Sequence, residues 1–483
     1  MELLSRPGRG SAGGTLFRSG QAPRVGGPRI ALLTPYTGNN LGDAATQDSM
    51  IANIRARLPE AEFSGISLSD ENFVRQHGGD AFPLCGTDRP FHGMSREGIP
   101  LRFSKEESHG RQPRHQAEKW ALLKGALKRI PLLGRGLKRL HTSVVHIGDE
   151  LRHCLRGYRF IRNHELLIVS GGGQLDDEWG GAWGHPFALF KWAVLSRIAR
   201  VTVVFTSVGA CKVTGRTSRF LLSSALRLSQ YRSYRDKRSK QIAMSLLQRT
   251  VNDPVVPDLA FSLPPSELPP PAGIRGVARG RTMVAVSPIA YAKPGSWPSE
   301  DRAVYERYTQ ETARVIAQLL EQQYFVVIVW SALSDKKVVS DVIERLDATS
   351  KTMLDRQMLI PEIASWRDLV SILRDVDLLV ASRLHSVILG FIAATPTLAI
   401  SFDPKVDWAM EDLGQTDYLL QIQDFVAADV VDALDRLEFR KQSIRVEISA
   451  YRQRILSESA PQYDTLARIA DESFGYQSKE VAH

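Results

Sequence analysis

Arg383 and His385 are the residues of this chain whose types and positions best fit chemistry. They follow the apolar run 378–382, which has the length of a buried strand, and precede the apolar run 387–394, which we expect to form a helix. Arginine offers a rigid fork of N–H donors for a carboxylate or phosphate, and histidine is the side chain that titrates near neutral pH. Either both side chains serve a ligand, or Arg383 pairs with a nearby acid and His385 caps the helix.

The elements around this pair predict a parallel sheet. A second apolar run, 397–402, follows Pro396, so strand, helix and strand succeed one another within about 25 residues. This order and length are typical of a βαβ unit. Because ligands of such sheets bind at the carboxyl ends of the strands, Arg383 and His385 fall where a ligand would lie.

Two glycine-containing turns follow other predicted strands. The strand 29–34 runs into an Asn/Gly turn before a helix, and the strand 166–170 runs into three glycines. Backbone N–H groups at such turns can meet an anion, and glycines let a ligand come close, whereas a tight turn with a helix cap is the structural alternative. The glycine spacing fits neither the dinucleotide fingerprint nor the P-loop. We take as candidate ligand-cleft backbone Asn40, Gly42, Asp43, Gly171, Gly172 and Gly173.

The alternation of strand-like and helix-like stretches predicts an α/β protein with two Rossmann-like domains, whose parallel sheets face a cleft. We assign residues 29–262 to the first domain and 282–445 to the second. The stretch 263–281 is rich in Pro, Gly and Ser and has the composition of a linker. Residues 1–28 are predicted to be a flexible tail, and 446–483 to be C-terminal helices and a tail.

Composition sets limits on the function. The chain has 483 residues, 43% of them hydrophobic and 24% charged, which suits two globular domains with extensions. No apolar run reaches the ~18 residues of a membrane helix, and the N-terminus lacks the apolar core of a signal peptide. The scattered cysteines, Cys85, Cys154 and Cys211, have neither a disulfide framework nor metal-ligand spacing, and we expect a cytoplasmic protein.

The net charge of +9 favours anionic partners, although we expect no nucleic acid. The stretch 85–163 is predicted to be a basic insertion in the first domain, with amphipathic helices within 116–140. Such helices suit an anionic membrane surface at the inner face of the membrane, or they are the solvated face of packed helices. The basic residues interleaved with Leu and Ile there are Lys124, Lys128, Arg129, Arg135, Lys138 and Arg139.

Three acids follow the glycine triplet, at Asp176, Asp177 and Glu178. The aromatic and histidine residues after them do not repeat at the spacing of metal ligands. We therefore expect no metal site.

Six short motifs occur in the order that is typical of polysaccharide pyruvyl transferases, and the chain resembles this family from about residue 29 to residue 414, apart from the insertion. The resemblance implies a fold similar to that of two-domain GT-B glycosyltransferases. It also implies phosphoenolpyruvate as the donor substrate, no further cofactor, and a product in which a sugar of a cell-surface polymer carries a pyruvate ketal. The motifs are Asn40-Leu41-Gly42-Asp43, Gly171-Gly172-Gly173, Tyr234-Arg235-Asp236, Pro257-Asp258-Leu259-Ala260-Phe261, Arg383-Leu384-His385 and Ser401-Phe402-Asp403-Pro404-Lys405.

The resemblance also implies roles for single residues. Phosphoenolpyruvate carries a carboxylate and a phosphate, and we expect Arg235, Arg383, Leu384 and Lys405 to bind it. His385 is expected to be the general acid that protonates the enol carbon. The acceptor is expected to be a saccharide, free or lipid-linked. Two alternatives stay open: a glycosyltransferase of the same fold with a nucleotide-sugar donor, and a non-catalytic binding protein of a polysaccharide assembly complex.

Overall fold

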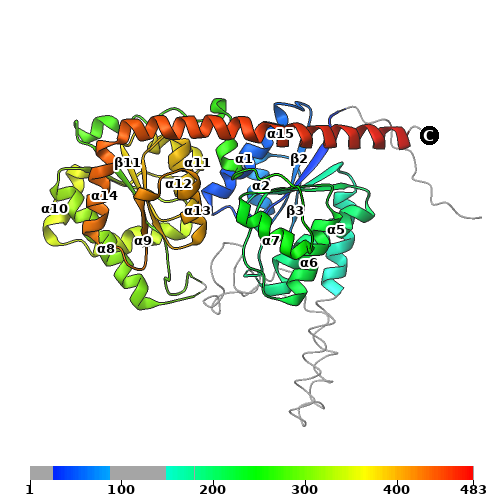
Figure 1. Cartoon of the computed structure of the whole chain (residues 1–483), viewed down its shortest axis with the longest axis horizontal. Coiled ribbons are helices and arrows are strands. Elements are labelled where there is room, and N and C mark those ends of the chain that lie inside the picture. The colour runs from blue at the N-terminus through cyan, green and yellow to red at the C-terminus, as the bar shows by residue number, and fades with distance from the viewer. Residues whose placement is uncertain (1–25, 87–147, 179, 298, 482–483) are drawn as a thin grey trace, which may run out of the picture.

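A computed structural model describes residues 26–86, 148–178, 180–297 and 299–481 (Figure 1). Two α/β domains lie side by side, each built on one sheet, and one long helix runs across both. The predicted fold class is confirmed. The N-terminal tail and the predicted amphipathic helices within 116–140 lie outside the described residues.

The N-terminal sheet has seven parallel strands in the order β3-β2-β1-β4-β6-β5, with β7 paired to β6. Its central strand β4 is buried along its whole length, because helices cover both faces of the sheet. The strands are β1 (Arg29–Leu33), β2 (Glu62–Ser67), β3 (Ala81–Pro83), β4 (Leu166–Ser170), β5 (Gly173–Leu175), β6 (Thr202–Ala210) and β7 (Tyr231–Tyr234).

The helices of this domain follow its strands. A helix at 148–161, inside the predicted insertion, buries His153 and Ile161 and packs with Gly157 against Trp192 of α5. The others are α1 (Leu41–Arg55), α2 (Asp70–His77), α5 (His185–Ile198), α6 (Arg216–Leu228) and α7 (Lys237–Leu247).

The C-terminal sheet has six parallel strands in the order β10-β9-β8-β11-β12-β13. They are β8 (Met283–Ser287), β9 (Phe325–Ile328), β10 (Met358–Leu359), β11 (Leu378–Ala381), β12 (Thr397–Ser401) and β13 (Leu419–Gln421). The helices are α8 (Arg302–Glu321), α9 (Leu333–Glu344), α10 (Ala348–Gln357), α11 (Trp366–Leu373), α12 (Leu384–Ile392), α13 (Pro404–Asp412) and α14 (Ala427–Phe439).

The segment between the sheets contains three short 3₁₀ helices, and the last two of them lie in the predicted linker 263–281. They are η4 (Leu259–Ser262), η5 (Pro265–Glu267) and η6 (Ile274–Ala278). Arg275 pairs with Asp377 at 2.7 Å, and the Ile274 N–H donates to Asp375 at 2.8 Å. This segment is therefore attached to the C-terminal domain by specific polar contacts.

The start of α1 joins the two domains. The Leu41 N–H donates to the Ser331 carbonyl at 2.9 Å, and the Leu333 N–H donates to the Asn39 carbonyl at 3.0 Å. Leu41 and Ala45 of α1 are buried in the core of the C-terminal domain. The two domains are thus joined at this point by hydrogen-bonded backbone.

Helix α15 (Lys441–Val481) runs along both domains (Figure 1). Its first half buries Ile444, Ile448 and Ile455 in the C-terminal core. Its second half buries Tyr463 and Leu466 in a cluster beneath β1 and β4 of the N-terminal domain. One helix therefore fixes the two sheets relative to each other.

Candidate functional site

Arg383 is held at the carboxyl end of β11 by a buried acid. It is the N-cap residue of α12, and its Nε and Nη2 donate to the two carboxylate oxygens of Asp335. Asp335 is fully buried in the first turn of α9 and also accepts the Ala290 N–H at 3.0 Å. The explanation that Arg383 pairs with a nearby acid is therefore correct, while the Nη1 donors of Arg383 are not used in this pair.

His385 lies against the start of α1. Its Nε2 is 4.0 Å from Oδ1 of Asp43 and, among the described residues, has no hydrogen-bond partner. A Cβ at position 42 would lie 1.9 Å from Cγ of His385, so only glycine lets the imidazole approach α1. α12 has no side-chain cap, and His385 does not act as one.

Asp43 shares its surroundings with His385. Burial raises the pKa of Asp43, while His385 and Arg383 oppose this rise. At 4.0 Å the carboxyl and the imidazole are too far apart for a hydrogen bond, and they form an ion pair only when the imidazole is protonated.

Arg235 follows β7 on the facing domain. Its Nε is 3.5 Å from Asp236 and its Nη1 is 3.7 Å from Asp258, and its side chain is 10% exposed. A Cβ at Gly209 would lie 2.9 Å from the guanidinium carbon, so this glycine leaves the space that Arg235 fills. Asp236 itself caps α7 by accepting the Ser239 N–H.

Lys405 crosses from the C-terminal domain toward the glycine triplet. A Cβ at Gly173 would lie 3.9 Å from Nζ of Lys405 and 3.6 Å from Oδ2 of Asp176. Burial disfavours the charge of Lys405, but the Asp403 carboxylate and the Cys211 thiol outweigh burial and raise its pKa. Lys405 is thus a charged lysine in a confined space.

Asp176 is 2% exposed, and its Oδ1 has no hydrogen-bond partner among the described residues. Burial raises the pKa of Asp176 to about 6, although Lys405 lowers it. The carboxyl therefore loses its proton close to neutral pH, which suits a group that exchanges protons.

Asp258 links two groups of these side chains. The Arg235 half consists of Arg235, Lys405 and Asp176, and the Arg383 half consists of Arg383, Asp335, His385 and Asp43. Asp258 lies near Arg235, and its charge raises the pKa of Asp43. Its Oδ1 caps η4 by accepting the Ala260 N–H, and its Oδ2 has no hydrogen-bond partner among the described residues. We call the whole set the cleft cluster: Asp43, Asp176, Arg235, Asp258, Asp335, Arg383, His385 and Lys405.

Helix N-termini surround the cleft cluster. Each of its cationic side chains lies within the first turn of a helix or next to it, as do Asp43 and Asp335. The positive ends of helix dipoles favour a bound anion. The helices that begin here are α1, α7, α9, α12 and α13.

The remaining predicted residues lie beside the cleft cluster. Asn40 caps α1 and pairs its backbone with Ala332. Leu384 packs on the C-terminal core. Gly171 has a φ of +53° and Gly172 one of +69°, and the Gly171 N–H donates to the Thr206 carbonyl. The glycine triplet thus forms the turn from β4 into β5, and one of its N–H groups is used within the sheet.

Sequence reasoning missed Asp335 and gave Asp258 no role. Asp335 lies 48 positions before Arg383 and reads as an ordinary helix N-terminal acid. The one available signal for Asp258 was its place in the Pro257–Phe261 motif. The contacts of both acids with arginines are recognised only when the neighbouring strands are placed side by side in the folded sheet.

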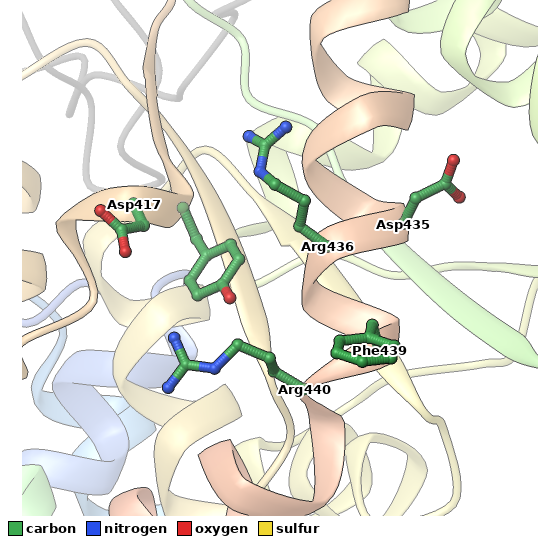
Figure 2. Close-up of a pocket in the computed structure, with 6 residues that line it drawn as sticks. Asp417, Asp435, Arg436, Phe439 and Arg440 are labelled. Carbon is green, nitrogen blue, oxygen red and sulfur yellow. The ribbon is translucent and has the colours of Figure 1, made fainter.

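A separate hollow of about 680 Å³ opens on the C-terminal domain. Figure 2 shows Arg436 and Arg440 extending toward the segment of Asp417, with Phe439 beside them. Its lining includes no member of the cleft cluster, and Phe439 is 92% exposed. The hollow is an open depression of the surface, distinct from the cleft cluster.

The described residues contain neither a cluster of metal ligands nor a helix that could span a membrane. No group of three or more His, Cys, Asp or Glu side chains in the described ranges has a geometry that would hold a metal. Within these ranges, every helix is too short or too polar to cross a bilayer.

The chain matches known proteins in family and in fold. The family model of polysaccharide pyruvyl transferase matches residues 40–404, while no curated protein gives a significant match. A protein designated UDP-N-acetylglucosamine 2-epimerase from Listeria monocytogenes superposes with a TM-score of 0.52 at 9% identity, covering 91% of this chain and 97% of that one. A UDP-glucose:anthocyanidin 3-O-glucosyltransferase in complex with UDP gives 0.51 at 11% identity, with 92% and 99% covered. At such identities the likeness shows the fold alone, that of two Rossmann-like domains in the GT-B arrangement.

Proposed function

Because the chain belongs to the polysaccharide pyruvyl transferase family, we propose that it transfers the enolpyruvyl group of phosphoenolpyruvate to a saccharide and closes it as a pyruvate ketal. The observation that carries this proposal is the convergence of Arg235, Arg383 and Lys405 with His385 at helix N-termini of both domains. Such a site suits a small ligand with two anionic groups.

The donor has a carboxylate at one end and a phosphate at the other. Arg235 and Lys405 lie on the side of the glycine triplet, while Arg383 is two residues from His385 at the start of α12 and has Nη1 donors that its pair with Asp335 does not use. Binding of the donor between them brings its methylene carbon near the imidazole. Leu384, packed on the core, holds Arg383 and His385 on either side of it at the start of α12.

The reaction begins with proton transfer. His385 donates a proton to the methylene carbon, which becomes a methyl group, and C2 gains cationic character. A sugar hydroxyl attacks C2, and its proton passes to Asp43, whose Oδ1 lies 4.0 Å from Nε2 of His385. Asp43 then returns this proton to His385, which restores the general acid.

Loss of phosphate completes the transfer. The C–O bond to phosphate breaks, and the phosphate leaves with the electron pair of that bond. A second hydroxyl of the same sugar attacks C2, and its proton goes to the phosphate. The overall reaction converts phosphoenolpyruvate and a sugar diol into a pyruvate ketal and hydrogen phosphate. It needs no oxidant or reductant. Asp176, which titrates near pH 6, is suited to accept a proton from a hydroxyl.

One experiment in heavy water tests the proposal. The protein is incubated in D₂O with phosphoenolpyruvate and extracted lipid-linked or free oligosaccharides, and products are analysed by mass spectrometry and phosphate release. We expect a ketal whose methyl group carries one deuterium, with one phosphate released per ketal.

The same samples distinguish the alternatives. Transfer from UDP- or GDP-sugars, with no phosphate released from phosphoenolpyruvate, would identify a glycosyltransferase. Neither transfer, together with donor binding by a well-folded protein, would identify a binding protein.

A further inference from the structure

We propose that the outer helical face of the N-terminal domain is a docking surface for an anionic lipid bilayer. This docking face consists of the exposed side of the helix at 148–161 and its neighbours α5, α6 and α7. It is separate from the cleft cluster, and the inference does not depend on the proposed reaction.

The helix at 148–161 exposes two leucines among arginines. Leu151 is 60% and Leu155 is 62% exposed, and they lie one turn apart on the same side of the helix. The opposite side buries His153 and Ile161. The exposed arginines around the leucines are Arg152, Arg156, Arg159 and Arg162, and one of them, Arg152, pairs with Asp149.

The neighbouring helices extend the same chemistry. Gly157 packs on Trp192 of α5, and the rings of Phe190 and Phe220 join α5 to α6 at 6.4 Å between centroids. Figure 1 shows α5, α6 and α7 together on one side of the domain. Within their bounds these three helices contain no Asp or Glu, and their basic residues outside the core are Arg197, Arg216, Arg219, Arg227, Lys237, Arg238 and Lys240. Arg238, at the start of α7, pairs with Glu411 of α13 and therefore faces the C-terminal domain and is not part of the docking face.

Large apolar side chains are also exposed at the two ends of α5 and on α6. Ile198 at the end of α5 and Phe220 on α6 are each 62% exposed, and Trp183 before α5 is 71% exposed. Single exposed apolar residues are ordinary. Here they accompany leucines and arginines on adjacent helices, which is the composition of a surface that enters the headgroup region of a bilayer.

The outer helices of the C-terminal domain differ. α14 carries Asp429, Asp432, Asp435 and Glu438 against one arginine, Arg436. α9 mixes acids and lysines. The absence of acids within α5, α6 and α7 is therefore local to these three helices and does not follow from the net charge of the chain; the helix at 148–161 carries two acids, Asp149 and Glu150.

Charge decides which occupant fits. The stretch 116–140 of this chain is itself basic, so like charges disfavour it as a cover for the arginines around Leu151 and Leu155. An anionic lipid surface satisfies the arginines and the leucines together. An acidic protein partner would satisfy the charges, and the experiment separates it from lipid.

The test uses the full chain and vesicles of phosphatidylcholine with and without phosphatidylserine, at low and high salt. We expect binding to the anionic vesicles alone, weakened by salt. Arg156→Gln with Arg159→Gln should weaken binding about tenfold or more, because each base near an anionic surface contributes about fivefold in affinity. Leu151→Gln with Leu155→Gln should also weaken it, by removing the inserted side chains.

The matched control removes two exposed arginines elsewhere. Arg454→Gln with Arg468→Gln on α15, whose side chains are 59% and 63% exposed, should leave binding unchanged. Melting temperatures show that each variant is folded. The proposal is wrong if the intact protein does not bind anionic vesicles, which is the result expected if the partner is an acidic protein. It is also wrong if the protein binds both types of vesicle equally well, or if the α15 variant loses as much binding as the Arg156 and Arg159 variant.

A third variant tests the insertion separately. Lys124→Gln, Lys128→Gln, Arg129→Gln and Arg135→Gln remove four bases of the stretch 116–140. If this variant abolishes binding while the Arg156 and Arg159 variant binds as the parent does, the insertion is the membrane contact and the docking face is not.

Discussion

The two halves of the cleft cluster hold their arginines in different ways. Arg383 is fixed by both oxygens of Asp335, with Nη2 at 2.9 Å from Oδ1, and this acid is fully buried. Arg235 has its carboxylates farther away, at 3.5 Å in Asp236 and 3.7 Å in Asp258. Both of these acids are already helix caps.

The difference indicates that the two arginines have different roles. A guanidinium group that is already hydrogen-bonded to a carboxylate keeps a fixed position and has few N–H donors left for a ligand. A guanidinium group whose carboxylates are farther away keeps its N–H donors for the carboxylate or phosphate of a ligand. We therefore expect the Arg383 half to orient α12 and His385, and the Arg235 half to supply most of the donor affinity.

The largest effect should come from His385→Gln. Removing a placed general acid costs about 10²–10⁴-fold in kcat, with little change in donor affinity. Measuring kcat, donor affinity and melting temperature on one sample separates a catalytic role from a structural one. Added imidazole should restore part of the activity of His385→Ala. Normal turnover per folded molecule would remove His385 from the mechanism.

Asp335→Ala should destabilise the protein by removing the acid that holds Arg383. It leaves the largely shielded Arg383 without its carboxylate, and losing one partner of a buried pair costs about 3–5 kcal/mol in the free energy of unfolding. Asp258→Asn is the matched change beside Arg235 and should cost much less, because Asn still caps η4. Denaturant unfolding measures both. Equal costs would contradict the comparison.

Asp176 should give the Arg235 half a pH-dependent stability. Its pKa is about 6 in the folded protein and about 4 in an unfolded chain, so the folded state binds more protons between these values. The free energy of unfolding should therefore fall as pH rises from about 4 to about 6, by up to about 3 kcal/mol from this group. Asp176→Asn should remove that contribution. Parallel pH profiles for the two proteins would show that Asp176 titrates normally.

Arg235→Lys should weaken donor binding by about 1–3 kcal/mol, because it keeps the charge and loses the fork. Arg238→Lys, at the second residue of α7, is the control. Its pair with Glu411 is at the surface, with 45% and 60% exposure, and such pairs contribute little. Isothermal titration with phosphoenolpyruvate measures both variants. A donor affinity unchanged in Arg235→Lys would make Arg235 a structural residue.

The strands and the helix that carry Arg383 and His385 could be predicted from the local sequence pattern. The unit β11–α12–β12 lies close to where its apolar runs predicted it, because a buried parallel strand and a buried helix both read as continuous apolar sequence. Ser365 and Asp368 form a capping box at the start of α11, a signal that lies within four residues of the sequence.

The partners within the cleft cluster had no such signal. Asp335 meets Arg383 because β8, which lies between β9 and β11 in the sheet, brings the start of α9 beside the start of α12. Gly42 is required by the ring of His385, which comes from the other domain. Short elements were missed too, β3, α2 and α10 among them, since three strand residues or two helical turns carry little periodicity.

Helix α15 has a consequence for how the protein is made. The N-terminal domain is synthesised early, yet Tyr463, Leu466, Ile469 and Ala470 cover its apolar surface beneath β1 and β4. Until those residues leave the ribosome, that surface is open to water and to other chains. A nascent chain that stops before residue 463 thus has an N-terminal domain with exposed apolar surface, which is prone to aggregate unless a chaperone binds it. Synthesis and docking of α15 bury that surface.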